Sequence, residues 1–171
     1  SKQSRGLGDV YKRQLFYKGF QGLATYRAAH CLWNDNRHTM ALFFQNRASE
    51  VFGVDIHPAA NIAGGVMIDH ATGVVIGETS KIDKNVSIYQ GVTLGGKGFE
   101  IGDRHPKIKS GVSIFASSTI LGNIVIGKNA KIAAGSLVLK DVDEDVTVAG
   151  IPAKEICCLL YTSPSPRDCL L

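Results

Sequence analysis

The sequence predicts a mainly β protein, in which a parallel β-helix of six-residue repeats follows a short α-helical segment. Two observations carry this prediction: aliphatic residues recur every six positions over most of residues 54–138, whereas residues 15–53 show three- and four-residue spacing. The 171 residues are 44% hydrophobic and 20% charged, with 19 glycines, which is typical of a globular chain and excludes a disordered polymer. A single domain with a core of useful size is therefore expected.

The two ends of the chain look foreign to the rest. Residues 4–14 (SRGLGDVYKRQ) can be encoded by a DNA string whose reverse complement encodes residues 158–168 (CLLYTSPSPRD). This DNA resembles the inverted adapters of transposon-based sequencing libraries. We therefore interpret residues 1–14 and 157–171 as adapter-derived and residues 15–156 as the native part.

Charge and cysteine content depend on those ends. Removing them takes away five basic and two acidic residues, so the formal net charge falls from +4 to +1, and the cysteines fall from four to one. A nucleic-acid partner and a disulfide framework thereby lose their support. No apolar run reaches the roughly 18 residues of a membrane span, so no membrane association is expected.

Residues 15–53 are expected to form two helices. In the first, Phe16, Phe20, Leu23, Ala24 and Arg27 recur at helical spacing. One residue of the Asn34–Asn36 break is expected to cap a second helix from Arg37 to Phe52, and Gly53 is expected to close it. That second helix offers one side made of Met40, Phe43, Phe44, Arg47 and Val51.

The six-residue period begins after residue 54 and defines the inward positions of the β-helix. Its three runs are Ile56, Ile62, Ile68, Val74; then Ile76, Ile82, Ile88, Leu94; and then Ile108, Ile114, Ile120, Ile126, Ile132, Val138. Three hexads would make a triangular coil of 18 residues, and coils stack about 4.8 Å apart by strand pairing. The β-helical domain is therefore expected over residues 54–150.

Two segments leave this pattern. Residues 95–107 interrupt the hexads and are expected to protrude as a loop, which on a stiff scaffold is a common place for functional residues. The acidic residues 141–145 are expected to end the regular coils, and residues 151–156 are expected to lead away as the start of a C-terminal tail.

Histidines near the coils are the main candidates for chemistry. His70 follows the inward Ile68, and it is either a hydrogen-bonded turn residue or a general base, because imidazole titrates near neutral pH. Asp55 lies 15 residues earlier and is expected near His70 on the adjacent coil, where it would orient the ring. Arg104 and His105 in the loop form a cationic pair suited to a carboxylate, or else an ordinary solvated loop.

Four blocks give the chain a family resemblance: DIHPAA at 55–60, DHATG at 69–73, VTLGG at 92–96 and GDRHPKI at 102–108. Together with the hexads they resemble the serine O-acetyltransferases, across residues 15–156. The resemblance implies a left-handed β-helix, homotrimers with active sites between neighbouring prisms, and transfer of an acetyl group from acetyl-CoA to the hydroxyl of L-serine, the first step of cysteine synthesis from serine.

The resemblance also implies roles for particular residues. His70 matches the catalytic base and Asp55 its orienting partner. Asp69 matches a contact of the substrate ammonium, and Arg104 and His105 match contacts of its carboxylate. The wall along which coenzyme A lies corresponds to Gly96, Ala116, Ala134 and, less directly, Lys131.

Further expectations follow from the resemblance. They are acetyl-CoA as co-substrate, no metal, inhibition by L-cysteine and a cytoplasmic location. The chain is expected to lack most of an N-terminal helical domain and the native C-terminal tail. Hexamers and docking to O-acetylserine sulfhydrylase are therefore expected of the parent protein only.

Three alternatives remain open on the residues. A zinc lyase of the γ-carbonic anhydrase type uses similar coils, and His57, His70 and His105 would then be ligands. Another hexapeptide acyltransferase would keep the base but take a sugar or an antibiotic as acceptor. A purely structural β-helix would have no active site.

Overall fold

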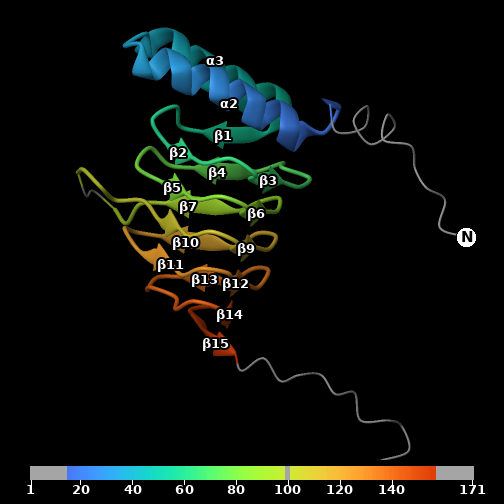
Figure 1. Ribbon diagram of the computed structural model, residues 1–171, viewed down its shortest axis with the longest axis vertical. Coiled ribbons are helices and arrows are strands. Elements are labelled where there is room, and N and C mark those ends of the chain that lie inside the picture. Colours follow the sequence, from blue (N-terminus) through green and yellow to red (C-terminus); the bar gives the residue numbers. More distant parts are fainter. Residues whose placement is uncertain (1–14, 99–100, 157–171) are drawn as a thin grey trace, which may run out of the picture.

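The computed structural model describes residues 15–98 and 101–156, so the interpretation of the two ends as adapter-derived lies outside the described residues. Two helices lie at one end of a stack of β-coils (Figure 1). They are α2 (Lys18–Asn34) and α3 (His38–Phe52). Among these residues, no helix is both long enough and apolar enough to cross a membrane.

The strands form three mainly parallel sheets, which are the faces of the prism. Sheet A contains β1 (Val54–Ile56), β4 (Val74–Ile76), β7 (Thr93–Gly95), β10 (Thr119–Leu121) and β13 (Leu137–Val138). Sheet B contains β2 (Asn61–Ile62), β5 (Lys81–Ile82), β8 (Lys107–Ile108) and β11 (Val125–Ile126). Sheet C contains β3 (Met67–Ile68), β6 (Ser87–Ile88), β9 (Ser113–Ile114), β12 (Lys131–Ile132), β14 (Thr147–Gly150) and β15 (Ala153–Ile156).

The predicted hexad residues are the core of this prism. All fourteen are buried, with exposed fractions of 6% or less. Regular coils are 18 residues long, as where Ile76 pairs with Leu94. Because successive side chains of a strand alternate between its two faces, each short strand contributes its aliphatic residue to the interior. The predicted parallel β-helix is confirmed.

Two departures from the 18-residue coil shape the surface. The first coil is longer, since Ile56 pairs with Ile76 rather than with Val74, and the extra two residues lie in the turn after Ile68. Ile82 pairs with Ile108, so the chain has an insertion between β7 and β8, and the described residues of this insertion project from the side of the stack (Figure 1). The predicted protruding loop is confirmed.

The end of the chain differs from the expectation. Val142 pairs with Ile126 and Val148 with Ile132, so the acidic stretch lies inside one more, shortened coil. Residues 153–156 do not lead away but fold back as β15, antiparallel to β14. Val142 within the acidic stretch and Val148 after it continue the strand pairing, which the acidic composition concealed.

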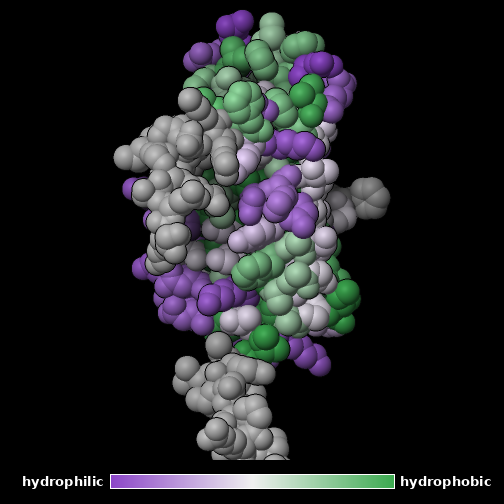
Figure 2. Space-filling view, turned by 90° about the vertical axis from the view of Figure 1, so that its right-hand side faces the viewer, coloured by the Kyte–Doolittle hydropathy of each residue, from purple (hydrophilic) through white to green (hydrophobic). Residues whose placement is uncertain are grey.

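The helices pack mainly through small residues, whereas most aromatic side chains of the predicted helix faces stay exposed. Gly19 and Gly22 lie so close to the first coil that a Cβ at Gly19 would be 1.8 Å from the Ile68 carbonyl oxygen. Phe20 is half exposed, as are most of the α3 side chains expected to share one face, and apolar side chains reach the surface at the helical end (Figure 2). Close packing of a helix on backbone requires glycine or alanine at the contact.

The loop between the helices also differs. α3 begins after Arg37, whose side chain makes no capping hydrogen bond, and no residue of Asn34–Asn36 serves as its N-cap. Asn36 instead adopts a left-handed conformation, with φ of 60°. Gly53 closes the helix in the left-handed conformation, as expected.

Candidate active site

The candidate residues gather on two edges of the prism. We call the turns that lead from sheet C to sheet A the C/A edge (residues 69–73, 89–92, 115–118 and 133–136). The turns that lead from sheet A to sheet B are the A/B edge (residues 57–60, 77–80, 96–106 and 122–124). Both edges flank sheet A, and each carries part of the predicted site.

His70 lies on the C/A edge in the widened turn of the first coil. His70 and Ala71 both have φ of 58°, a left-handed conformation that costs a non-glycine residue about 1–2 kcal/mol. Ala71 is fully buried and anchors the turn, whereas the His70 side chain is about three-quarters exposed. Backbone strain of this kind is often found at functional sites, where the surrounding structure maintains it.

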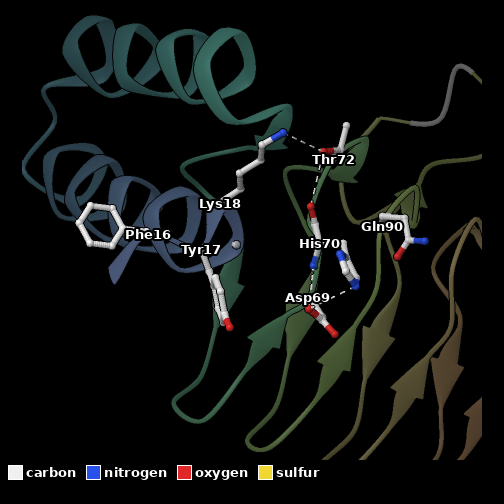
Figure 3. A pocket seen from close by; sticks show the side chains of 8 residues that line it. Phe16, Tyr17, Lys18, Asp69, His70, Thr72 and Gln90 are labelled. Carbon is white, nitrogen blue, oxygen red and sulfur yellow. Dashed lines mark hydrogen bonds and ion pairs between the residues drawn. The ribbon is translucent and has the colours of Figure 1, made fainter. Parts of the chain in front are cut away.

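The carboxylate nearest to the His70 ring is that of Asp69. Asp69 Oδ1 accepts the backbone N–H of His70 at 2.9 Å and lies 3.9 Å from its Nε2 (Figure 3). Asp55 instead accepts a hydrogen bond from Gln45 Nε2 at 2.7 Å. Within the described part of this single chain, no hydrogen bond or ion pair joins Asp55 to His70.

A groove of about 780 Å³ surrounds His70 and continues to the start of α2. Its walls include Tyr17, Lys18, Thr72 and Gln90, and the Gln90 amide lies beside the imidazole (Figure 3). Lys18 Nζ donates to Thr72 Oγ1 at 3.4 Å. These side chains were not singled out from the sequence, although Gln90 takes the place of His70 in the next coil, because Ile68 pairs with Ile88.

Arg104 and His105 lie together on the A/B edge. Arg104 Nη2 donates to Glu78 Oε2 at 2.9 Å, and His105 Nδ1 lies 2.9 Å from Thr79 Oγ1. Burial, reinforced by the neighbouring Arg104 guanidinium, lowers the pKa of His105, so its ring is neutral at neutral pH. The expectation of a cationic pair is therefore wrong for His105: the pair offers one cation and one uncharged imidazole.

Asp55 and His57 belong to the same A/B side. The pKa of His57 is lowered by burial, against the opposing charges of Glu78 and Asp55. His57 Nδ1 accepts the backbone N–H of Ala59 at 3.1 Å, and Trp33 of α2 packs edge-on against its ring. Glu78 and Thr79 were missed from the sequence, because only the pairing across the inserted loop places them beside Arg104 and His105.

The residues expected along coenzyme A also divide between the edges. Ala116 and Ala134 follow His70 and Gln90 down the C/A edge, one coil apart. Gly96 lies on the A/B edge, where a Cβ would be 3.2 Å from Arg104 Cγ. Lys131 is exposed on sheet C. No group of three or more histidine, cysteine or acidic side chains able to hold a metal occurs within residues 15–98 and 101–156.

The chain spans about half the length of the curated relatives that it matches. It is 59% identical over 140 residues to the serine acetyltransferase of Haemophilus influenzae, which covers 82% of this chain and 52% of the relative. It is 56% identical over 147 residues to that of Escherichia coli K12, which covers 85% and 54%. Residues 105–140 match the family described as bacterial transferase hexapeptide (six repeats).

Solved structures agree with these relatives. Neisseria gonorrhoeae serine acetyltransferase in complex with serine is 57% identical, with a TM-score of 0.81 over 84% of this chain and 58% of that chain. The Brucella abortus enzyme in complex with coenzyme A is 54% identical, with a TM-score of 0.82 over 82% and 56%. A serine acetyltransferase in complex with cysteine is 57% identical, with a TM-score of 0.82 over 83% and 59%. With its hexad core, its inserted loop and these relatives, the chain belongs to the serine acetyltransferase family.

Proposed function

We propose that this chain carries the acetyl-transfer site of a serine acetyltransferase. The reaction moves the acetyl group of acetyl-CoA to the hydroxyl of L-serine and gives O-acetylserine and coenzyme A, the first step of cysteine synthesis from serine. The observation that carries the proposal is the strained, exposed His70 beside a carboxylate, in a chain whose relatives are solved with serine and with coenzyme A.

His70 is the general base in this proposal. Its imidazole takes the proton of the serine hydroxyl, and the serine oxygen forms a bond to the carbonyl carbon of the thioester. The tetrahedral intermediate then collapses, the carbon–sulfur bond breaks, and His70 returns its proton to the departing thiolate. A positioned acid–base group of this kind contributes about 10²–10⁴ in rate, and holding both substrates together supplies much of the rest.

The serine-binding groups come from both edges. Asp69, beside His70, offers a carboxylate to the ammonium, while Arg104 and His105 on the A/B edge offer donors to the carboxylate. Within the described residues, no hydrogen bond or ion pair joins His70 to Arg104 or His105. A site that uses all four therefore needs the C/A edge of one chain and the A/B edge of another, which supports a closed homotrimer.

Acetyl-CoA would lie between the same two edges. Small residues on the C/A edge (Ala116 and Ala134) leave room for an extended ligand, and Gly96 does the same on the facing A/B edge. Asp55, on the A/B side, would then orient the His70 of the neighbouring chain and not its own. Lys131 would be a further, cationic contact of coenzyme A, and the proposed reaction uses no metal.

Control of the whole protein belongs to the same proposal. L-cysteine resembles L-serine in all but one atom, and a relative is solved with cysteine, so cysteine would compete for the serine site. In the longer parent protein we expect hexamers, docking to O-acetylserine sulfhydrylase and a cytoplasmic location, as the family resemblance implies.

The decisive experiment measures thiol release from acetyl-CoA by the purified chain, with and without L-serine. Serine-dependent release that is suppressed by L-cysteine is the expected result. Release with a sugar acceptor only would identify another acyltransferase, and stoichiometric zinc without thiol release would favour a lyase. Either outcome would refute the proposal.

A further inference from the structure

Thr79 links the second coil to the inserted loop through more hydrogen bonds than any neighbour on that edge. Its hydroxyl oxygen lies 3.1 Å from the backbone nitrogens of both Arg104 and His105, which donate to it. Its own backbone N–H donates to His105 Nδ1 at 3.1 Å, and its hydroxyl lies 2.9 Å from the same nitrogen. One side chain thus positions both proposed carboxylate-binding residues.

These contacts determine which nitrogen of His105 carries the proton. A backbone N–H can only donate, so the Nδ1 atom that receives the Thr79 amide must present a lone pair. The Thr79 hydroxyl oxygen already accepts two backbone N–H groups, so it has no lone pair left to accept a proton from Nδ1. The proton of the neutral ring therefore resides on Nε2.

The pocket of His105 keeps this form. The residue is 7% exposed, and its ring fills the space above Gly77, where a Cβ would be 2.0 Å from Cδ2. Burial and the adjacent Arg104 lower the pKa of the ring, which favours the neutral form. Within the described residues, Nε2 of His105 has no hydrogen-bond partner. The one fully buried side-chain nitrogen or oxygen there that lacks a partner is Ser80 Oγ, so Nε2 of His105 must be accessible to solvent.

We propose that Thr79 is a positioning residue that fixes His105 as an uncharged Nε2–H donor, aimed at the carboxylate of the amino-acid substrate. The proposal rests on the proposed function and deepens it. Arg104, paired with Glu78, then supplies the positive charge beside the substrate carboxylate, and His105 supplies direction without charge. Substrate binding would therefore need no proton uptake by His105.

The tautomer is tested directly by nitrogen NMR of the full chain labelled with 15N-histidine, with His105→Asn used to assign the signal. We expect the shifts of an Nε2–H ring and a titration below the ordinary histidine range. Thr79→Val should give a mixture of tautomers and a higher pKa, because the hydroxyl contact and the anchoring of the loop are both lost. Thr79→Ser keeps the hydroxyl and should restore the original spectrum.

Kinetics provide the second readout. Thr79→Val should raise KM for L-serine about tenfold, equivalent to about 1.4 kcal/mol, while kcat and KM for acetyl-CoA change less. Thr25→Val is the matched control, since it also removes one hydroxyl hydrogen bond, but to Gln21 O within α2 and not to the inserted loop. It should leave both the spectrum and the kinetics unchanged.

The outcomes separate this proposal from the proposed function. A His105 ring protonated on Nδ1, or one whose signal is the same in Thr79→Val, overturns the positioning role, and the wild-type spectrum alone decides the first point if Thr79→Val does not fold. The expected spectra without any serine-dependent thiol release would instead overturn the proposed function and, with it, the serine-binding role of His105, but not its tautomer.

Discussion

His70 combines exposure, strain and a neighbouring carboxylate in one residue. Its left-handed backbone lies in the turn after Ile68, where the first coil has two residues more than a regular 18-residue coil. The following Ala71 is buried and holds the turn in place. The position of the imidazole therefore depends on the length of the first coil and not on the inserted loop between β7 and β8.

Replacing His70 by Ala should lower turnover about 10²- to 10⁴-fold, because the serine hydroxyl then loses its proton acceptor. The fold should persist, since the side chain is largely exposed. Steady-state thiol release at saturating substrates measures the effect, with circular dichroism as a check on folding. Gln90→Ala is the matched control, because Gln90 lines the same groove but its amide cannot act as a base at neutral pH. Near-normal turnover of His70→Ala would exclude the base role.

The two A/B-edge histidines make stability depend on pH. The pKa values of His57 and His105 are lowered in the folded protein, so both rings stay neutral there, while the unfolded chain takes up protons below the ordinary value of about 6.5. The two neutral rings therefore contribute their full share to the free energy of unfolding above a pH of about 6.5. This share is lost as the pH falls through the lowered pKa values of the folded protein.

Urea midpoints measured from pH 8 down to pH 5 test this expectation. The midpoint should fall with pH in the wild type and fall less in the double variant His57→Gln, His105→Gln. Carboxylates with ordinary pKa values titrate mostly below this range. A midpoint that rises on acidification would contradict the assignment of both rings as neutral.

At the level of elements, α2 closes the open end of the β-helix. Tyr26 Oη donates to Ala60 O at 2.5 Å, and Arg27 donates to the carbonyl oxygens of Ile62 and Ala63, the latter at 2.6 Å. The first coil has no strand above it, so these side chains satisfy carbonyls that a preceding coil would otherwise satisfy. They also protect an edge at which strands of another chain would add.

Arg27→Met should therefore destabilise the protein by about 1.5–3 kcal/mol, the range for hydrogen bonds to a charged group. Met keeps most of the apolar stem, so the loss reports the guanidinium contacts. Arg47→Met is the control: Arg47 is half exposed and pairs only with Glu50 along α3, so a change within about 0.5 kcal/mol is expected. Equal effects of the two substitutions in chemical unfolding would refute a capping role for Arg27.

The elements show where sequence reasoning succeeds. Every predicted hexad residue is buried, because one aliphatic residue in six has a single geometric explanation, whereas the inward Val142 and Val148 of the last, shortened coil were not predicted. Most of the packing face of the helices was not predicted: only Leu23 of the expected stripe packs against the core, and small residues, which give no periodic signal, make up most of the buried set, namely Gly19, Gly22, Tyr26, Ala29, Ala41 and Ala48. The β15 strand was missed for a similar reason, because the reversal of the chain after Gly150 carries no repeat that would predict it.

At the level of the whole molecule, the sequence proposed residues of the candidate site but not the partners that the fold gives them. Glu78 and Thr79 follow the hexad residue Ile76 and carry no motif, and only the pairing of Ile82 with Ile108 brings them under the loop. Likewise, the chain alone keeps His70 and Arg104 on different edges of sheet A. Contacts that depend on an insertion or on a second chain leave no local pattern in the sequence.

The division of the site between two edges makes a prediction for mixed oligomers. If each site combines the C/A edge of one chain with the A/B edge of the next, His70→Ala and Arg104→Ala disable different halves of it. Each variant alone should be nearly inactive, but trimers refolded from an equal mixture should regain about one quarter of the wild-type activity, because one random edge pair in four then carries both intact residues.

Mixing His70→Ala with Asp69→Ala is the matched control, since both changes lie on the same edge and a single chain must supply both residues. A mixture of His70→Ala and Arg104→Ala that stays as inactive as its components would mean that each chain completes its own site, and the edges would then have to meet by a movement within one prism.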